Sequence, residues 1–282
     1  MVIFMDILNK EHRGAKYFTY VILILLAAFM MIPFYWMLMS SLKHSHEVFA
    51  IPLTWWPNYP VWSNYTDIWT RIPLVTFIGN SAFLTLTVTV LQLLTSNFAA
   101  YAFSKLRFPG RNVLFLLYVS SIAIPWQAYM VPQFIMFRAM GLVNTHMAMI
   151  VLQAFTAFGV FLTKQFYDSI PNELLESARI DGMSEYQIWR KIMLPLSKPV
   201  LATLTIITFV FTWNDFLGPR IYLMSQNLWT LQIGMRMFVG QYSSEFALIM
   251  AVATVSLVPV LAVFLGLQRF FVQGISTTGI KG

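Results

Sequence analysis

The sequence has no cysteine and very few charged residues. Of its 282 residues, only 10% are Asp, Glu, Lys or Arg, whereas soluble domains contain roughly 25%. The absence of cysteine excludes disulfides, thiolate metal sites and cysteine nucleophiles. The scarcity of charge, with 58% hydrophobic residues and a mean hydropathy of +0.68, argues against a soluble enzyme and is typical of an integral membrane protein.

The sequence also lacks the usual device for holding ATP. No Lys-Ser or Lys-Thr pair occurs anywhere, so the Gly-x-x-x-x-Gly-Lys-Ser/Thr phosphate loop is absent. With no histidine in the core of an apolar stretch, no catalytic constellation of a membrane enzyme can be assembled. His44, His46 and Glu47 have no further candidate ligand nearby in the sequence, so we interpret them as part of a hydrated loop and predict no metal site.

Long apolar stretches predict an all-α integral membrane protein with six transmembrane helices. Such segments must be helical in lipid, because the backbone hydrogen bonds have to be made within the segment. A cytoplasmic segment, 1–16, precedes the helical domain 17–271, and a cytoplasmic tail, 272–282, follows it. The predicted spans are 17–40, 74–103, 113–130, 146–162, 200–217 and 246–267.

The distribution of basic residues predicts that both termini are cytoplasmic. With this orientation, 13 of the 18 Lys and Arg residues lie in cytoplasmic segments and 5 in outer segments. Cytoplasmic loops of membrane proteins carry such an excess of basic residues. Topology therefore accounts for the net charge of +7, and we expect no nucleic-acid partner.

The cytoplasmic loop 165–199 between the fourth and fifth spans predicts two short helices. Pro171 suits the first position of a helix, and Gly182 suits its end because glycine tolerates the left-handed conformation. Ser184 and Gln187 form a capping box that begins the second helix, which we expect to end before Pro195.

Apolar residues of this loop suggest a protein partner. Leu174, Leu175, Ala178 and Met183 give the helix pair an apolar surface that we expect to face the cytoplasm. An exposed apolar surface marks an interaction site. The alternative is that these residues pack on the protein's own membrane bundle.

The same loop carries a recognisable motif. Residues 176–182, Glu-Ser-Ala-Arg-Ile-Asp-Gly, followed by Pro195, resemble the EAA signature of bacterial ABC-importer permeases, with Ser177 in place of an alanine. Trp213-Asn-Asp-Phe-Leu and the terminal Gly279-Ile-Lys-Gly are further matches. Together with the six spans, they resemble the second permease of carbohydrate importers of the maltose-transporter type, a type also seen for glycerol 3-phosphate.

The resemblance implies a type I importer fold in a bacterial cytoplasmic membrane. It implies four kinds of partner: a second permease, two ATPase subunits or domains, an extracytoplasmic binding protein and membrane lipid. ATP and Mg are used by the ATPase, and this chain binds no cofactor. The tail 276–282 is expected to reach the ATPase. The residues expected to couple to it are Glu173, Glu176, Ser177, Ala178, Arg179, Asp181, Gly182 and Met183. Glu176 can pair either with Arg179 or with a basic residue of the ATPase.

Polar residues within the spans predict a translocation path. Such residues are costly in lipid and face the bundle interior or a water-filled path, although they can equally connect helices by hydrogen bonds. Asp215 suits either an outer gate or a hydrated helix end. The outer segment 220–245 is expected to dock the binding protein. Candidate path residues are Asn80, Thr85, Gln92, Gln127, Gln153, Thr208, Trp213, Asn214 and Asp215.

The sequence therefore predicts a permease subunit that imports a sugar or oligosaccharide. The alternative within the class is glycerol 3-phosphate or a glycerophosphodiester. A phosphate site favours Arg or Lys, and the predicted span cores contain neither. The alternative from another class is an ATP-independent carrier or channel.

Overall fold

The computed structural model describes residues 13–239 and 245–278, and these are mainly α-helical. The chain divides into two compact units: residues 1–73 with 235–258, and residues 74–234 with 259–282. Helix α15 (Phe246–Thr278) contributes to both, because the division falls at Pro259 within it.

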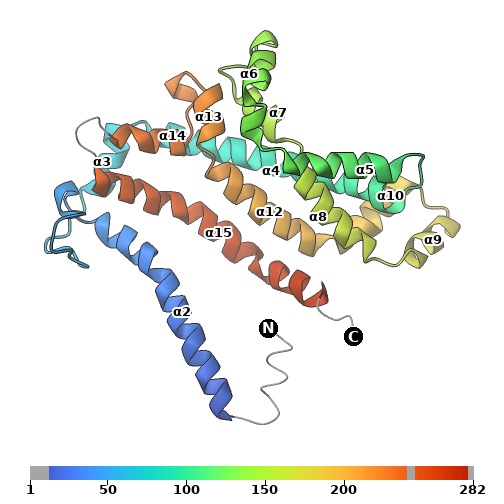
Figure 1. Ribbon diagram of the computed structural model, residues 1–282, viewed down its shortest axis with the longest axis horizontal. Coiled ribbons are helices and arrows are strands. Elements are labelled where there is room, and N and C mark those ends of the chain that lie inside the picture. Colours follow the sequence, from blue (N-terminus) through green and yellow to red (C-terminus); the bar gives the residue numbers. More distant parts are fainter. Residues whose placement is uncertain (1–12, 240–244, 279–282) are drawn as a thin grey trace. The chain divides into compact units, whose positions relative to one another are not determined.

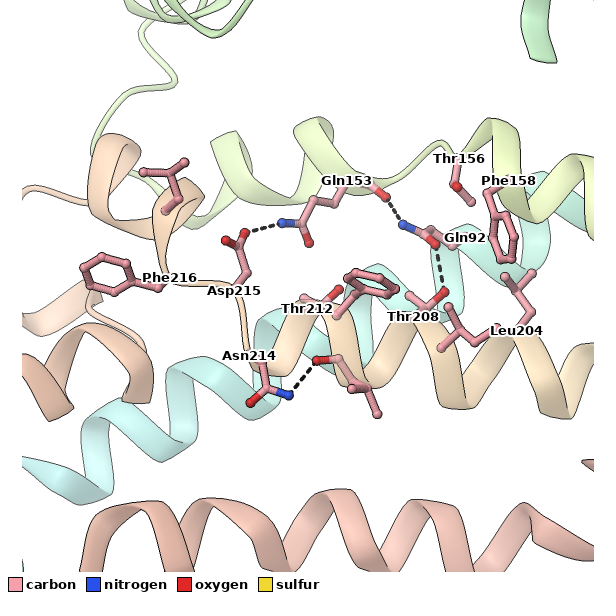
Figure 2. Close-up of a pocket in the computed structure, with 14 residues that line it drawn as sticks. Gln92, Gln153, Thr156, Phe158, Leu204, Thr208, Thr212, Asn214, Asp215 and Phe216 are labelled. Carbon is pink, nitrogen blue, oxygen red and sulfur yellow. Dashed lines mark hydrogen bonds between the residues drawn. The ribbon is translucent and has the colours of Figure 1, made fainter. Parts of the chain in front are cut away.

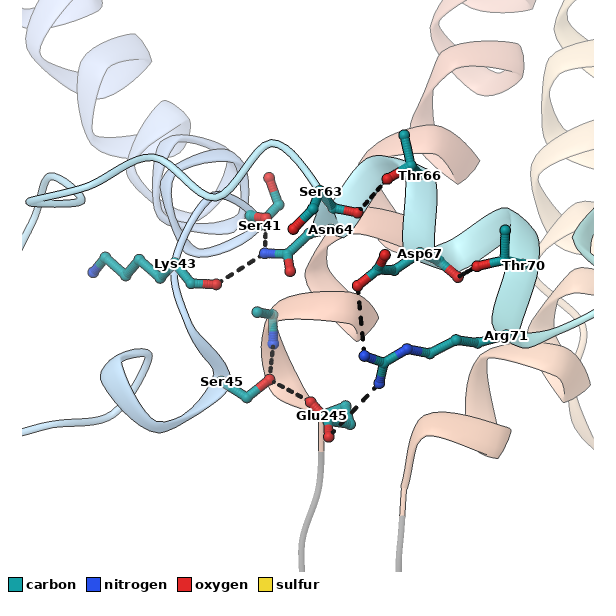
Figure 3. Close-up of polar contacts among 11 residues, drawn as sticks. Ser41, Lys43, Ser45, Ser63, Asn64, Thr66, Asp67, Thr70, Arg71 and Glu245 are labelled. Atoms are coloured by element: carbon teal, nitrogen blue, oxygen red, sulfur yellow. Dashed lines mark hydrogen bonds and ion pairs between the residues drawn. The ribbon is translucent and has the colours of Figure 1, made fainter.

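The first unit contains a long apolar helix and a polar cluster. Its elements are α2 (Arg13–Ser40), η1 (Ser45–Glu47), α3 (Asn64–Arg71), η6 (Arg236–Phe238) and the first part of α15. The Asn64 amide donates to the backbone oxygens of Ser41, at 2.8 Å, and Lys43, at 2.9 Å (Figure 3). Glu245 accepts a hydrogen bond from Ser45 at 2.9 Å and lies 3.9 Å from the Arg71 guanidinium. These contacts connect α3 and the start of α15 to the turn that follows α2.

Helix α2 carries apolar side chains on all sides. None of the residues in its most apolar window is buried within the chain, and Phe29 and Met30 are each 71% exposed. A helix that is hydrophobic all round is suited to lipid or to other membrane helices, and α2 is long and apolar enough to cross a membrane.

In the second unit, α4 (Leu74–Lys105) is the central helix. Helices α7 (His146–Gln153), α8 (Ala157–Asp168) and α12 (Lys198–Trp213) pack against it (Figure 1). Gly159 of α8 permits the close approach to α4, since a Cβ atom there would overlap the Ser96 hydroxyl. Small residues allow membrane helices to approach closely in this way.

Shorter elements complete the second unit. They are α5 (Arg111–Ser120), η2 (Ser121–Ala123), η3 (Trp126–Ala128), α6 (Met130–Ala139), α9 (Glu173–Ile180), α10 (Glu185–Ile188), η4 (Trp189–Met193), α11 (Leu194–Leu196), α13 (Leu217–Tyr222), η5 (Gln226–Leu228) and α14 (Leu231–Met235).

The predicted third span, 113–130, is wrong as a continuous helix. Helix α5 ends at Ser120, and two single 3-10 turns flank Pro125 before α6 begins at Met130. Proline has no N–H to donate and its ring collides with the preceding turn. Among the described residues, four segments are long and apolar enough to cross a membrane: 16–40, 74–105, 146–168 and 246–270. A fifth qualifies if the bent pair 185–196 and 198–213 forms one span.

Three other predicted boundaries also need correction. The fourth span, predicted at 146–162, is interrupted after Gln153 and continues from Ala157 to Asp168. The Thr156 hydroxyl caps this restart by accepting from the Gly159 N–H at 3.3 Å. The fifth span ends at Trp213 rather than at residue 217, and α15 extends to Thr278, beyond the predicted 267.

Candidate functional site

The turn between α9 and α10 forms as its residues predict. Gly182 has φ +80°, its N–H donates to the Arg179 oxygen, and the Met183 N–H donates to the Ala178 oxygen, both at 3.0 Å. This is the Schellman pattern of a helix end. The predicted capping box is confirmed as well, with Ser184 N–H donating to Gln187 Oε1 at 2.9 Å. We refer to residues 172–196 as the helix-pair segment.

Both prolines of the predicted helix pair depart from their predicted roles. Helix α9 begins at Glu173 after Asn172, so Pro171 precedes it. Pro195 does not end the second helix, because α10 continues through the π-helical turn η4 into α11. In that turn the Leu194 N–H donates to the Trp189 oxygen five residues back. The wider π turn accommodates the proline ring, which an α-helical interior would exclude.

The apolar residues of the helix-pair segment are divided between the bundle and the surface. Leu175 is 1% exposed and Ala178 5%, within a cluster that includes Tyr101 and Tyr167. The expectation that these two residues face the cytoplasm is therefore wrong, because the protein's own bundle covers them. Leu174 remains 48% exposed, and Met183 is half-buried against the same cluster. Sequence reasoning missed the most exposed apolar residue, Ile180, at 85%.

The charges of the helix-pair segment are arranged around Glu185. The Arg179 guanidinium donates to Glu185 Oε1 at 2.7 Å, and the Tyr101 hydroxyl donates to Oε2 at 2.6 Å. Arg179 thus pairs with Glu185, and the pair with Glu176 considered from the sequence does not form. A hollow of about 750 Å³ lies between this cluster and residues 104–111. The predicted coupling residues exposed at the surface are Glu173, Glu176, Ser177, Arg179, Asp181 and Gly182.

A second hollow, of about 980 Å³, lies between α12 and the break separating α7 from α8. Hydrogen bonds run along its wall (Figure 2). The Gln153 amide donates to Asp215 at 2.7 Å, the Gln92 amide donates to the Gln153 backbone oxygen at 2.6 Å, and the Thr208 hydroxyl donates to Gln92 at 2.8 Å. We refer to this hollow as the amide-lined cavity. The wall is mainly apolar, and these polar side chains form one hydrogen-bonded chain across it, which fixes their orientation.

Five predicted path residues line the amide-lined cavity: Gln92, Gln153, Thr208, Asn214 and Asp215. They come from α4, α7, the C-terminal half of α12 and the two residues that follow it, so folding brings together residues far apart in sequence. Sequence reasoning missed Thr156, Phe158, Phe211, Thr212 and Phe216, which also line it. Thr212 lies four residues after Thr208, and this spacing alone indicates the same helix face.

The other predicted path residues lie elsewhere. Asn80 donates to the backbone oxygens of Asn227, at 2.8 Å, and Trp229, at 2.9 Å, and so holds the segment around these two residues. Thr85 is fully buried, and Trp213 is buried and stacks on Phe209 with ring centroids 5.8 Å apart.

Other sequence predictions concern the surface or residues that the structure does not describe. Gln127 is exposed in η3. In the predicted docking segment, residues 240–244 lie outside the described residues, as do 279–282 of the predicted tail. Within residues 13–239 and 245–278, no group of three or more metal-ligating side chains occurs.

Long apolar helices, a capped helix pair and a cavity with a chain of hydrogen-bonded polar side chains in its wall are the features of a membrane permease subunit. The chain belongs to the family of binding-protein-dependent transport system inner membrane components, whose sequence profile matches residues 92–277. It is therefore the non-catalytic, multi-pass inner-membrane subunit of an ATP-binding-cassette importer. The ATPase subunit of the importer uses ATP.

Two relatives and one solved structure illustrate the similarity. The chain is 34% identical over 249 residues to the arabinooligosaccharides transport system permease protein AraQ of Halalkalibacterium halodurans, covering 87% of this chain and 89% of the relative. It is 30% identical to the sn-glycerol-3-phosphate transport system permease protein UgpE of Pectobacterium atrosepticum, covering 94% and 98%.

The solved structure is a bacterial ABC transporter involved in the import of the acidic polysaccharide alginate. One of its chains superimposes with a TM-score of 0.79 at 25% identity, and the similarity covers 93% of this chain and 99% of that chain. The family and the importer permease fold are thus shown, whereas the three names differ in their solute.

Proposed function

We propose that this chain is the second permease of an importer for a neutral sugar or oligosaccharide, and that the amide-lined cavity is its share of the translocation path. The lining carries the proposal. Of the fourteen described residues that line it, none is Lys or Arg and only Asp215 is ionisable. Amides and hydroxyls suit the hydroxyls of a sugar, and Phe158, Phe211 and Phe216 offer faces for its apolar ring.

The second candidate is glycerol 3-phosphate or a glycerophosphodiester, favoured by the similarity to UgpE over nearly the whole chain. A phosphate is bound most strongly by Arg or Lys. The described cavity wall contains no Arg or Lys and contains the carboxylate of Asp215. The part of the path formed by this chain therefore disfavours an anionic solute.

Reconstitution with the second permease, the ATPase and the binding protein separates these candidates. ATP hydrolysis is measured with arabino- and malto-oligosaccharides, and separately with glycerol 3-phosphate and glycerophosphodiesters. We expect stimulation by one of the oligosaccharides and none by the phosphates. Stimulation by the phosphates alone would reverse the assignment. Uptake of the solute when the ATPase is omitted would instead indicate a carrier.

We further propose that the helix-pair segment docks into the ATPase through its exposed side. Ile180 is 85% exposed beside the exposed Glu176 and Asp181. An apolar residue ringed by charges suits a protein interface. Ile180→Lys should prevent co-purification of the ATPase, whereas Asn112→Lys, at an exposed position of α5 outside the helix-pair segment, serves as the matched control. Equal ATPase retention by both variants would contradict docking at Ile180.

The proposed topology has six spans and both termini in the cytoplasm. The natural absence of cysteine makes the orientation testable with a single substitution, Asn112→Cys, in the exposed segment at the start of α5. A membrane-impermeant maleimide should label this cysteine only after cells are permeabilised. Labelling of intact cells would invert the topology.

A further inference from the structure

One buried amide in α4 connects three other elements. Asn97 is 1% exposed. Its Oδ1 accepts from the Trp189 indole N–H at 2.5 Å and from the Tyr167 hydroxyl at 2.8 Å, while its Nδ2 donates to the Ser197 hydroxyl at 3.4 Å. The side chain of Asn97 therefore holds η4, α8 and the start of α12 together.

Two of these partners lie on the sharpest bend of the chain's described spans. The helices 185–196 and 198–213 meet at 74°. Ser197 is the residue between them, and Trp189 lies on the first arm, in the π-helical turn. Trp189 also stacks on Phe98, with ring centroids 4.1 Å apart and planes inclined by 20°. Asn97 and its neighbour Phe98 thus contact both the first arm and the corner.

The two arms of the bend lead to the two parts of the candidate site. The first arm begins at Glu185, which binds Arg179 of α9. The second arm, α12, carries Thr208, which lies on the wall of the amide-lined cavity. On the C-terminal side of the helix-pair segment, a displacement passes this corner before it reaches α12 and the cavity residues that α12 carries.

We propose that Asn97 is a positioning residue for transport, which fixes the corner at Ser197 so that α12 follows the movement of the helix-pair segment. The proposal rests on the proposed function, in which that segment docks into the ATPase. An unsatisfied amide at this depth is costly, so all three hydrogen bonds favour one angle between the arms. A π-helical turn in a helix is uncommon and is frequent at functional sites.

Distances between paired spin labels test the proposal in the reconstituted complex. Because the chain has no cysteine, labels can be placed on introduced cysteines alone. Val90 on α4 is the reference, paired either with Tyr186 on α10 or with Phe211 on α12; they are 54%, 57% and 75% exposed. The distances are measured without nucleotide and with ATP plus vanadate.

We expect both distances to change in the otherwise unsubstituted protein. In Asn97→Leu the Val90–Tyr186 change should persist and the Val90–Phe211 change should be lost. The matched control is Asn80→Leu, which removes two hydrogen bonds of the same helix but none at the corner; both changes should persist.

A milder variant covers the case in which Asn97→Leu does not assemble. Trp189→Phe with Ser197→Ala removes two of the three bonds and keeps an aromatic ring beside Phe98. It should reduce the Val90–Phe211 change selectively. If the Val90–Phe211 distance changes as much in Asn97→Leu, or in Trp189→Phe with Ser197→Ala, as in the unsubstituted protein, then Asn97 has no positioning role. That result would leave the proposed function intact. If neither distance changes in the unsubstituted protein, docking to the ATPase is itself refuted.

Discussion

Replacement of Gly182 tests whether the geometry of the helix-pair turn is needed for transport. Gly182 has φ +80°, and no atom of a residue beyond its two chain neighbours lies within 4 Å of the position that a Cβ would occupy. A side chain there meets no neighbour, so only the backbone conformation is perturbed. Gly182→Val places a β-branched residue in the left-handed region, whereas Gly182→Asn introduces a residue that tolerates it.

The expected cost can be worked out from this geometry. A residue other than glycine in the left-handed conformation costs roughly 1–2 kcal/mol, and 1–2 kcal/mol changes an equilibrium constant about 5- to 30-fold. In the Gly182→Val variant the equilibrium constant for forming the native turn therefore falls by about that factor. The hydrogen bonds from the N–H groups of residues 182 and 183 are lost whenever the turn opens, and α9 is then no longer held in position beside α10.

The assay is ATP-dependent uptake in membrane vesicles, normalised to the amount of permease in the membrane. Gly182→Val should lose most of the uptake with its membrane level unchanged, and Gly182→Asn should retain most of it. Uptake by the valine variant at the unsubstituted rate would refute the reasoning. An equal loss in the asparagine variant would show that the absence of a side chain, rather than the conformation, matters.

Three further predictions concern packing, charge and the cavity. Gly159→Ala should lower the thermal stability of the purified complex by about 1–3 kcal/mol, because its Cβ would overlap Ser96. Gly79→Ala, at an open helical position, should leave the stability unchanged. Equal effects of the two substitutions would contradict the close α4–α8 contact. Burial lowers the pKa of Lys43, so the folded protein loses this proton first and its stability should rise with pH towards the ordinary pKa of 10.5. Lys43→Met should abolish that rise in a thermal-unfolding series, and an unchanged pH profile would contradict it. Gln153→Leu removes the side-chain donor of Asp215 Oδ2, at a cost of about 1–3 kcal/mol, and should reduce uptake. Gln127→Leu, outside the cavity, should not reduce it. Equal uptake by the two variants would count against the proposed path.

The sequence by itself determined the class of the protein and the local ends of its helices. Long apolar runs in a chain with little charge have to be membrane helices, because lipid offers no hydrogen-bond partner to the backbone. The Gly182 turn and the Ser184 cap depend only on residues a few positions apart, so their geometry follows from local chemistry. The family motif lies in that same locally determined stretch.

Only the tertiary structure decided which side chains share a site. Asn80, Asn97 and Gln92 are amides of one helix, yet Asn80 holds the segment around Trp229, Asn97 holds the corner at Ser197 and Gln92 lines the cavity. Their roles depend on the rotation of α4 and on which helices pack around it, and neither is encoded locally. Likewise, the residues near Leu175 show no local sign that the bundle will bury it, and nothing near Pro195 shows that a π turn will accommodate the proline. Packing between distant segments determined both outcomes.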